Sequence, residues 1–350
     1  MSARPIEAQP TEAILEQVST RERARRFDTD SLSSEHRTLT ESCGLLDRSQ
    51  RGKLALAGSG AVEFLNGQVT NELSTLRPGE GCYAAFLTHK GKMLGDLRIL
   101  AVGEDPSAPP HELLLDTERA ALQGLFDMIR HFKVGYEAEL YKRTLERGLL
   151  SLIGPDAARI AGAEQLAREE HANRPIAVSS IEALAVRTDV GIDLICRAEE
   201  TEQLAAALQS RGATPVGEQA AECLRIERGR PRYGVDLDQT VIPQEAGLNE
   251  RAVSFTKGCY VGQETVARLH YRGKPTRHLR GLVCSELAAA GQELRLGERT
   301  VGRITSTALS PRLGPIGLAL VRREAEPGSV VRVGDDGATA EIVELPFREA

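Results

Sequence analysis

Residues 51–67 have the sequence RGKLALAGSGAVEFLNG, in which an Arg-Gly pair leads into alternating apolar residues, a second glycine and a segment of small residues. Residues 147–163, RGLLSLIGPDAARIAGA, follow the same order, with Gly58 and Gly154 at matching positions. Alternation with a period of two predicts a strand, and the small apolar residues after each glycine predict a helix. This internal repeat predicts a body built from two similar halves.

Further strands and a second helix are expected after each copy of the repeat. The strands are expected within residues 81–92, 93–103, 111–116 and 181–196, and the helices within 117–132 and 198–212. Asp116 or Thr117 is expected to cap the first of these helices, and Gly212 to end the second. Each half thus approximates a β-α-β-β-α-β unit of ferredoxin-like type, which makes the fold class α+β.

The pattern becomes all-β near the end of the chain. Short apolar segments separated by Gly, Pro and Asp turns predict a small C-terminal β-barrel over residues 275–350. The body is therefore expected to occupy residues 36–274, with its two halves at about 36–145 and 146–274.

The composition of the 350-residue chain is that of an ordinary globular protein, and it excludes several classes. The net charge of -6 argues against non-specific nucleic-acid binding. No apolar segment approaches the roughly 20 residues that span a bilayer. The six cysteines are scattered and include no C-x-x-C pair, so neither a disulfide framework nor a self-contained zinc or iron–sulfur site is expected. We therefore expect a cytoplasmic protein with reduced thiols and, over the polar residues 1–35, a disordered or weakly helical leader.

Cys259 lies in the segment FTKGCYVGQETVARLHYRGK, residues 255–274, among glycines, amides and positive charge. Nearby cations such as Lys257 lower the pKa of a thiol and favour the reactive thiolate, and the first amides of a helix starting at GQETVARL would act in the same direction. The alternative is a buried apolar cysteine, the more usual role of an unpaired one. A single thiolate cannot hold an iron–sulfur cluster, so a partner would have to supply the other ligands.

Two further segments carry polar residues suited to a flat heterocyclic ligand. Tyr83 and Asp96 lie on adjacent expected strands and are expected to face one pocket, unless Asp96 is an exposed acid on an edge strand. The irregular segment 224–250 carries Arg225 and Glu245. A carboxylate there can pair with two N–H groups of an aminopyrimidinone ring, and an arginine can hold a carboxylate tail. A solvated loop with local ion pairs is the alternative.

Five segments together resemble one family: KGCYVGQE (257–264), IPQEAGLNERAVSF (242–255), RIERGRPRYG (225–234), FLNGQVTNEL (64–73) and YAAFLTHKGKMLGDLRIL (83–100). They are similar to the YgfZ-type folate-binding proteins of iron–sulfur cluster assembly and tRNA modification, a branch related to the glycine-cleavage aminomethyltransferases. The resemblance covers about residues 37–345, and the octet KGCYVGQE is its most specific motif.

The resemblance implies a tetrahydrofolate-binding α+β body and a C-terminal barrel arranged around a central channel. It matches Glu245 to a glutamate that binds the pterin ring, and Tyr83 and Asp96 to positions of the folate site. In the aminomethyltransferases Asp96 would be the second of two adjacent catalytic acids. Gly95 replaces the first of them here, which puts that chemistry in question.

From the resemblance we expect a factor for the assembly or repair of iron–sulfur proteins that uses tetrahydrofolate or a derivative. Cys259 would be the catalytic thiolate and the metal ligand of a transient cluster, shared with an A-type iron–sulfur carrier and client enzymes. Lys257 and Asp96 are the other catalytic candidates, and Arg225 and Gln263 are further candidates for binding the folate. The alternative is a tetrahydrofolate-dependent one-carbon (aminomethyl) transferase. A folate-dependent demethylase is a third possibility, but such oxidases usually need an attached flavoprotein domain.

Overall fold

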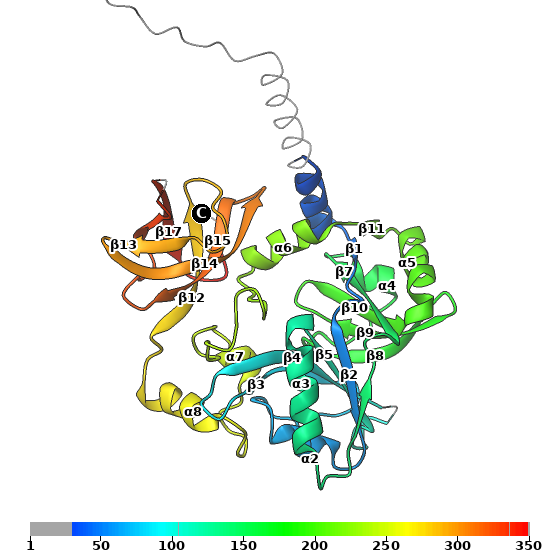
Figure 1. Cartoon of the computed structure of the whole chain (residues 1–350). Helices are drawn as coiled ribbons and strands as arrows, with labels where there is room; N and C mark the ends of the chain where they lie inside the picture. Colours follow the sequence, from blue (N-terminus) through cyan, green and yellow to red (C-terminus); the bar gives the residue numbers. More distant parts are fainter. Residues whose placement is uncertain (1–29, 104, 336, 349–350) are drawn as a thin grey trace, which may run out of the picture.

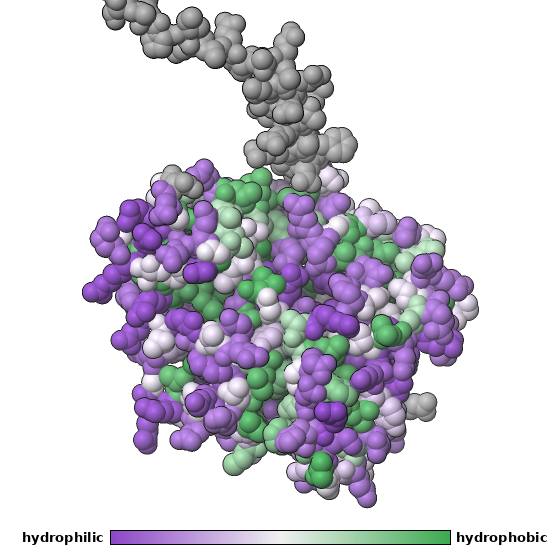
Figure 2. All heavy atoms as spheres, viewed as in Figure 1, coloured by the Kyte–Doolittle hydropathy of each residue, from purple (hydrophilic) through white to green (hydrophobic). Residues whose placement is uncertain are grey.

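The computed structural model describes residues 30–103, 105–335 and 337–348, which form two β-sheets with their helices and a closed barrel (Figure 1). The predicted α+β body and C-terminal barrel are both confirmed. In the space-filling view, hydrophilic residues cover most of this face of the molecule and hydrophobic ones form small separate patches (Figure 2). No helix in the described residues has the length and apolar content needed to cross a lipid bilayer.

The first sheet has five strands in the order β3-β4-β5-β2-β6. Its strands are β2 (Gly52–Ala57), β3 (Gly81–Leu87), β4 (Met93–Val102), β5 (Glu112–Thr117) and β6 (Glu139–Lys142), and its helices are α2 (Ala61–Asn66) and α3 (Arg119–Phe132). Helix α3 buries Ala121, Leu125 and Ile129, which recur every four residues and so share one face. The predicted cap of this helix is wrong: the N-cap is Glu118, while Asp116 and Thr117 are the buried last residues of β5.

The second sheet has six strands in the order β11-β1-β7-β10-β9-β8. Its strands are β1 (Gly44–Asp47), β7 (Arg147–Ile153), β8 (Asn173–Val178), β9 (Ile181–Arg187), β10 (Gly191–Arg197) and β11 (Thr214–Pro215), and its helices are α4 (Ala157–Ala161), η1 (Ala198–Glu200) and α5 (Thr201–Ser210). Strand β1 comes from the first half of the chain but pairs antiparallel with β7 of this sheet. The two sheets therefore do not divide the sequence as simply as the repeat suggested.

The repeat itself is confirmed in the backbone. Gly58 after β2 has φ +116°, and Gly154 after β7 has φ +131°, a region that residues with a Cβ rarely adopt. A Cβ added to Gly58 would lie 2.3 Å from the carbonyl oxygen of Glu137, and one added to Gly154 would lie 2.4 Å from that of Ser42. Each strand therefore needs a glycine to turn into the helix that follows.

Further helices connect the two sheets to the barrel. They are α6 (Glu218–Glu227), α7 (Asn249–Ala252) and α8 (Gln263–Arg272). Residues 30–41 are also helical, and Leu32 and Leu39 pack there against Val216 and Leu224. The predicted leader thus lies largely outside the described residues, and its final residues, 30–35, are helical.

The barrel closes in the order β12-β15-β14-β13-β16-β17. Its strands are β12 (Arg277–Cys284), β13 (Glu293–Leu296), β14 (Arg299–Ser310), β15 (Gly314–Arg322), β16 (Val330–Val333) and β17 (Ala338–Val343). Alternate residues such as Leu282, Leu294 and Val331 point into its apolar core. Strand β13, which is too short to give a clear pattern, was not predicted.

Candidate functional site

The two sheets face each other through strands β4 and β5 of the first and β7 and β10 of the second. At one end of this interface the contact is apolar, because Leu100 and Leu114 pack against Leu149 and Ile195. Each of these four strands has a polar residue two positions further along, on the same face. These residues are Arg98, Asp116, Ser151 and Asp193. The interface between the two sheets is therefore apolar at one end of these strands and polar at the other.

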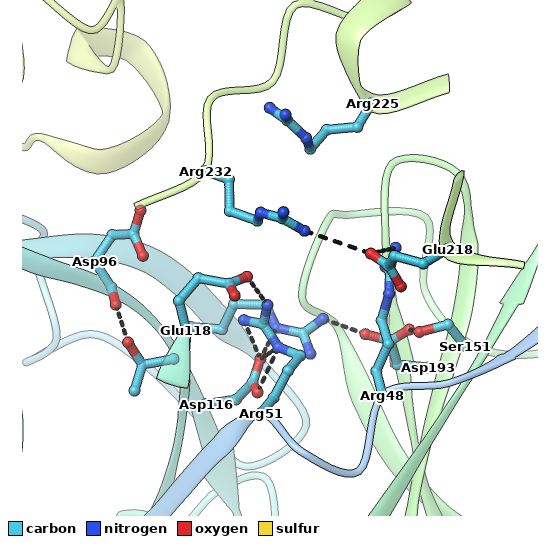
Figure 3. A network of polar contacts seen from close by, with 12 residues as sticks. Arg48, Arg51, Asp96, Asp116, Glu118, Ser151, Asp193, Glu218, Arg225 and Arg232 are labelled. Atoms are coloured by element: carbon cyan, nitrogen blue, oxygen red, sulfur yellow. Dashed lines mark hydrogen bonds and ion pairs between the residues drawn. The ribbon is translucent and has the colours of Figure 1, made fainter. Parts of the chain in front are cut away.

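The polar end is a network of buried charges. The guanidinium group of Arg98 is 2.6 Å from Asp116 on the neighbouring strand and 2.6 Å from Asp193 of the second sheet. Ser151 donates a hydrogen bond of 2.6 Å to Asp193, and Arg51 pairs with both Asp116 and Glu118. Figure 3 shows Asp96 on one side of this network and Asp193 with Ser151 on the other. Arg98 therefore links the two sheets.

Asp116 is fully buried within this network. Burial acts to raise the pKa of its carboxyl group, but the guanidinium groups of Arg51 and Arg98 outweigh it and hold the pKa well below its usual range. Asp116 was predicted to be a helix cap, and its role in this network was not predicted. The signal was present, since Asp116 directly follows three leucines and is two residues beyond Leu114, which puts both on the same face of a strand.

The network borders a central cavity of about 230 Å³ between the sheets. Seven arginines and seven acids line it, so its charge is nearly balanced. These residues are Arg48, Arg51, Arg98, Arg225, Arg230, Arg232 and Arg251, with Asp96, Glu118, Glu170, Asp189, Asp193, Glu218 and Glu222. They come from both sheets, from α6 and from the irregular segment after it, so the cavity forms only in the folded body.

Tyr83 and Asp96 face this cavity together, as the strand pattern indicated. The Tyr83 hydroxyl donates a hydrogen bond of 2.6 Å to Asp96 Oδ2, and the Arg251 guanidinium lies 5.2 Å from the centre of the Tyr83 ring. Asp96 is 5% exposed. Burial raises its pKa to about 6, although the hydrogen bond from Tyr83 acts to lower it. The carboxyl group therefore exchanges its proton near neutral pH.

His171 also lines the cavity and was not predicted. Its backbone is left-handed, with φ 72°, and the side chain is buried. Burial lowers the pKa of the imidazole to about 4, so the ring is neutral at pH 7. Among the described residues, its Nδ1 has no hydrogen-bond partner. His171 lies in an irregular segment, where no periodic pattern indicates which way a side chain points.

Arg225 lines the cavity as expected, and it also holds other parts of the protein together. Its guanidinium group pairs with Asp236 at 2.7 Å and with Glu222 at 2.9 Å, and donates to the hydroxyl of Ser306 in the barrel. These contacts leave Arg225 less available to hold a ligand carboxylate than the sequence suggested.

Glu245 does not line the central cavity. Its buried carboxylate pairs with Arg277 at 3.0 Å, and its backbone oxygen accepts a 2.7 Å hydrogen bond from Leu279. Both partners belong to β12, the first strand of the barrel. The structure thus gives this residue, matched by resemblance to a pterin-binding glutamate, a role in attaching the barrel to the body.

Lys257, Cys259 and Gln263 lie apart from the cavity as well. The ammonium group of Lys257 donates to the carbonyl oxygens of Asn66, Val69 and Asn71 at 2.6–2.8 Å. These three bonds use all its protons, so Lys257 has none left for the sulfur of Cys259. Burial lowers the pKa of Lys257 to about 8.

Cys259 is exposed on the protein surface and is not the core residue that was the alternative. Gln263 is the first residue of α8 and is half-buried. Neither residue lines the central cavity. The expected cluster of thiolate, lysine and folate is therefore not assembled at one place in this structure.

Comparison with known proteins gives a consistent result over nearly the whole chain. The family model of the GCVT N-terminal domain matches residues 7–257, and that of the glycine cleavage T-protein C-terminal barrel domain matches residues 277–348. The chain is 31% identical over 338 residues to the aminomethyltransferase of Geobacillus thermodenitrificans, covering 91% of this chain and 90% of that protein. It is 29% identical over 335 residues to the aminomethyltransferase of Streptomyces coelicolor, covering 89% and 88%.

A solved structure has the same fold. The crystal structure of glycine cleavage system aminomethyltransferase T from Bartonella henselae superposes with a TM-score of 0.79, covering 91% of this chain and 90% of that one, at 24% identity. At this identity the likeness shows the fold alone.

These relatives overturn the expectation of an iron–sulfur assembly factor. They are named aminomethyltransferase, and they match along both the body and the barrel. The findings therefore favour the alternative, a folate-dependent aminomethyl transferase. Nothing in them supports a cluster on Cys259.

Proposed function

The chain belongs to the glycine cleavage T-protein family, and from this premise we propose that it is a tetrahydrofolate-dependent one-carbon transferase. The observation that carries the proposal is the pair of Tyr83 and Asp96 at a cavity enclosed by both halves of the body. The octet KGCYVGQE, which indicated the YgfZ-type branch, stays a prediction about the branch.

The cavity fits a fused heterocycle better than a whole folate. Ligand pockets usually measure roughly 300–1,000 Å³, and this one, at about 230 Å³, lies below that range. A pterin presents ring nitrogens and N–H groups, which the Asp96 carboxyl group and the imidazole of His171 can pair with. The acidic tail of folate would then remain near the rim, where arginines such as Arg232 are partly exposed. Tetrahydrofolate, when bound, supplies the one-carbon unit.

Asp96 is the residue suited to move a proton in this cavity. With a pKa of about 6 it is mostly ionised at pH 7 and still able to take up a proton, which is what general acid–base catalysis requires. Tyr83 fixes the orientation of the carboxyl group through its hydroxyl.

A second acid beside Asp96 has no room. A Cβ added to Gly95 would lie 2.6 Å from the Cβ of Ala121 and 2.6 Å from the ring of Phe86. The position that carries the first of two acids in the aminomethyltransferases is therefore filled by the packing of α3 and β3 against β4. We propose that the reaction proceeds with the single carboxyl group of Asp96.

Binding of tetrahydrofolate by calorimetry and one-carbon transfer from methylene-tetrahydrofolate to candidate amines test the proposal. Asp96→Asn should weaken binding roughly 10- to 150-fold, the equivalent of a lost hydrogen bond to a charged group, and abolish transfer. The matched control is Asp238→Asn, an exposed acid outside the cavity, which should bind and react as the unaltered protein does. Equal binding by both variants, or no folate binding at all, would refute the proposal.

A further inference from the structure

Three side chains with metal-binding atoms meet outside the central cavity, at the helix α6 that also contributes to its lining. His36 lies on the helix at residues 30–41, and Cys223 and Glu227 lie on α6. Cys223 and Glu227 are four residues apart, so they share one face of α6, and that face is turned towards the first helix. Their ligand atoms, the His Nε2, the Cys Sγ and a Glu oxygen, all lie within 4.8 Å of one another.

The distances suit a shared ion. His36 Nε2 is 3.0 Å from Glu227 Oε1, and Cys223 Sγ is 3.8 Å from the same oxygen. Atoms that coordinate one tetrahedral zinc at about 2.0–2.3 Å are roughly 3.2–3.8 Å apart. Small side-chain adjustments would therefore place all three atoms around one ion without moving either helix.

The site is built and buried. His36 is 5%, Cys223 1% and Glu227 2% exposed. Ser310 at the end of β14 donates a hydrogen bond of 2.5 Å to Glu227 Oε1, the kind of outer contact that fixes a metal-binding carboxylate. The other carboxylate oxygen, Oε2, is buried and accepts no hydrogen bond within residues 30–103, 105–335 and 337–348, and the guanidinium group of Arg312 lies 3.6 Å from it as an ion pair. Because the ion pair with Arg312 is not a hydrogen bond, Oε2 keeps lone pairs that a metal ion can use.

Solvent reaches the edge of this cluster. His36 and Glu227 both line a surface cavity between the first helix and the end of β14, together with Arg37 and Arg312. This cavity gives an ion a path to the site, and it gives a bound ion a water molecule as a fourth ligand.

We propose that His36, Cys223 and Glu227 bind one Zn²⁺ ion. Nitrogen, sulfur and carboxylate oxygen form a mixed set that favours zinc over the hard cations Ca²⁺ and Mg²⁺, which take oxygen ligands. The ion fastens the helix at residues 30–41 to α6, and through Ser310 it also holds α6 to the barrel. This site is independent of the proposed transferase activity and lies outside the central cavity.

Metal content and the spectrum of a cobalt substitute test the proposal on the full chain. The protein is stripped with a chelator, dialysed against Zn²⁺ and then against metal-free buffer, and its zinc is measured by mass spectrometry. We expect about one Zn²⁺ per chain. Co²⁺ in its place should give a thiolate-to-cobalt charge-transfer band, which requires a cysteine ligand. Zinc should also raise the midpoint of thermal unfolding.

Two variants and a control locate the site. Cys223→Ala and His36→Gln should each bind Zn²⁺ roughly 100-fold more weakly, and Cys223→Ala should lose the charge-transfer band. Cys284→Ala removes a buried cysteine of the barrel outside the cluster, and it should behave as the unaltered protein does.

Circular dichroism of the metal-free variants checks their folding. If the variants fail to fold, the test rests on the unaltered protein, in which the thiolate-to-cobalt charge-transfer band is either present or absent. An unaltered protein without retained zinc or without the band, or a folded Cys223→Ala that binds zinc equally well, overturns the proposal.

Discussion

Replacing Asp96 with asparagine should stabilise the protein at neutral pH while it removes the proposed activity. The amide oxygen of asparagine can still accept the hydrogen bond from Tyr83, which is 2.6 Å long in the structure. The substitution therefore removes the charge of a buried carboxyl group and keeps its volume and its main contact. Functional residues often carry this kind of cost in stability.

The expected size of the effect comes from the pKa of Asp96. Burial raises it from 3.8 to about 6, so the folded protein holds this proton more tightly than the unfolded chain does. The contribution of the group to stability is then complete below pH 3.8 and is lost as the pH rises through about 6. At about 1.4 kcal/mol per pKa unit, the loss is roughly 3 kcal/mol. Because asparagine has no proton to lose, D96N should be more stable than the unaltered protein by roughly this amount at about pH 8.

Urea unfolding of both proteins between about pH 4 and about pH 8 measures the difference. All other groups titrate alike in the two proteins, so the difference isolates Asp96. It should be small at the acid end and grow between about pH 4 and pH 6. D238N, at an exposed position, should show no such trend. A difference that is independent of pH, or one that grows towards acid, would contradict the reasoning.

Two further predictions concern the glycine turns after β2 and β7 and the ion pairs between the two sheets. Gly58→Ala and Gly154→Ala should each lower the free energy of unfolding by at least about 1–3 kcal/mol, because the backbone is left-handed there and the added Cβ meets a carbonyl oxygen. Gly212→Ala, where φ is +104° but the space is open, should cost less in the same urea titration. Arg98→Met should cost about 3–5 kcal/mol, because it leaves Asp116 and a second carboxylate buried without their shared cation. An Arg98→Met protein of unaltered stability would show that the link between the sheets contributes little.

The sequence predicted well what depends on neighbouring residues. The strand, glycine and helix of the repeat were visible because period-two alternation and a left-handed glycine are local properties of the backbone. Alternation also placed Asp96 and Arg98 on one face of β4. It could not show what that face meets, and the partner of Arg98 in the second sheet, Asp193, is 95 residues away.

Similarity of motifs was less reliable for individual roles. Glu245 and Lys257 stand in segments that indicated a binding site, yet the first holds the barrel and the second is bound to three backbone oxygens. A side chain within a motif can serve packing or attachment instead of chemistry, as these two residues do. Which of the two applies is settled by the contacts the side chain makes in the folded protein.

The sequence by itself determined the two-fold repeat, the barrel and the faces of the strands, because these follow from the spacing of residues close together in the chain. Only the tertiary structure decided that Tyr83, Asp96 and His171 share one cavity and that His36 meets Glu227 across 191 residues. Such meetings depend on how sheets and helices dock, and docking is governed by the fit of whole surfaces, which no local pattern encodes.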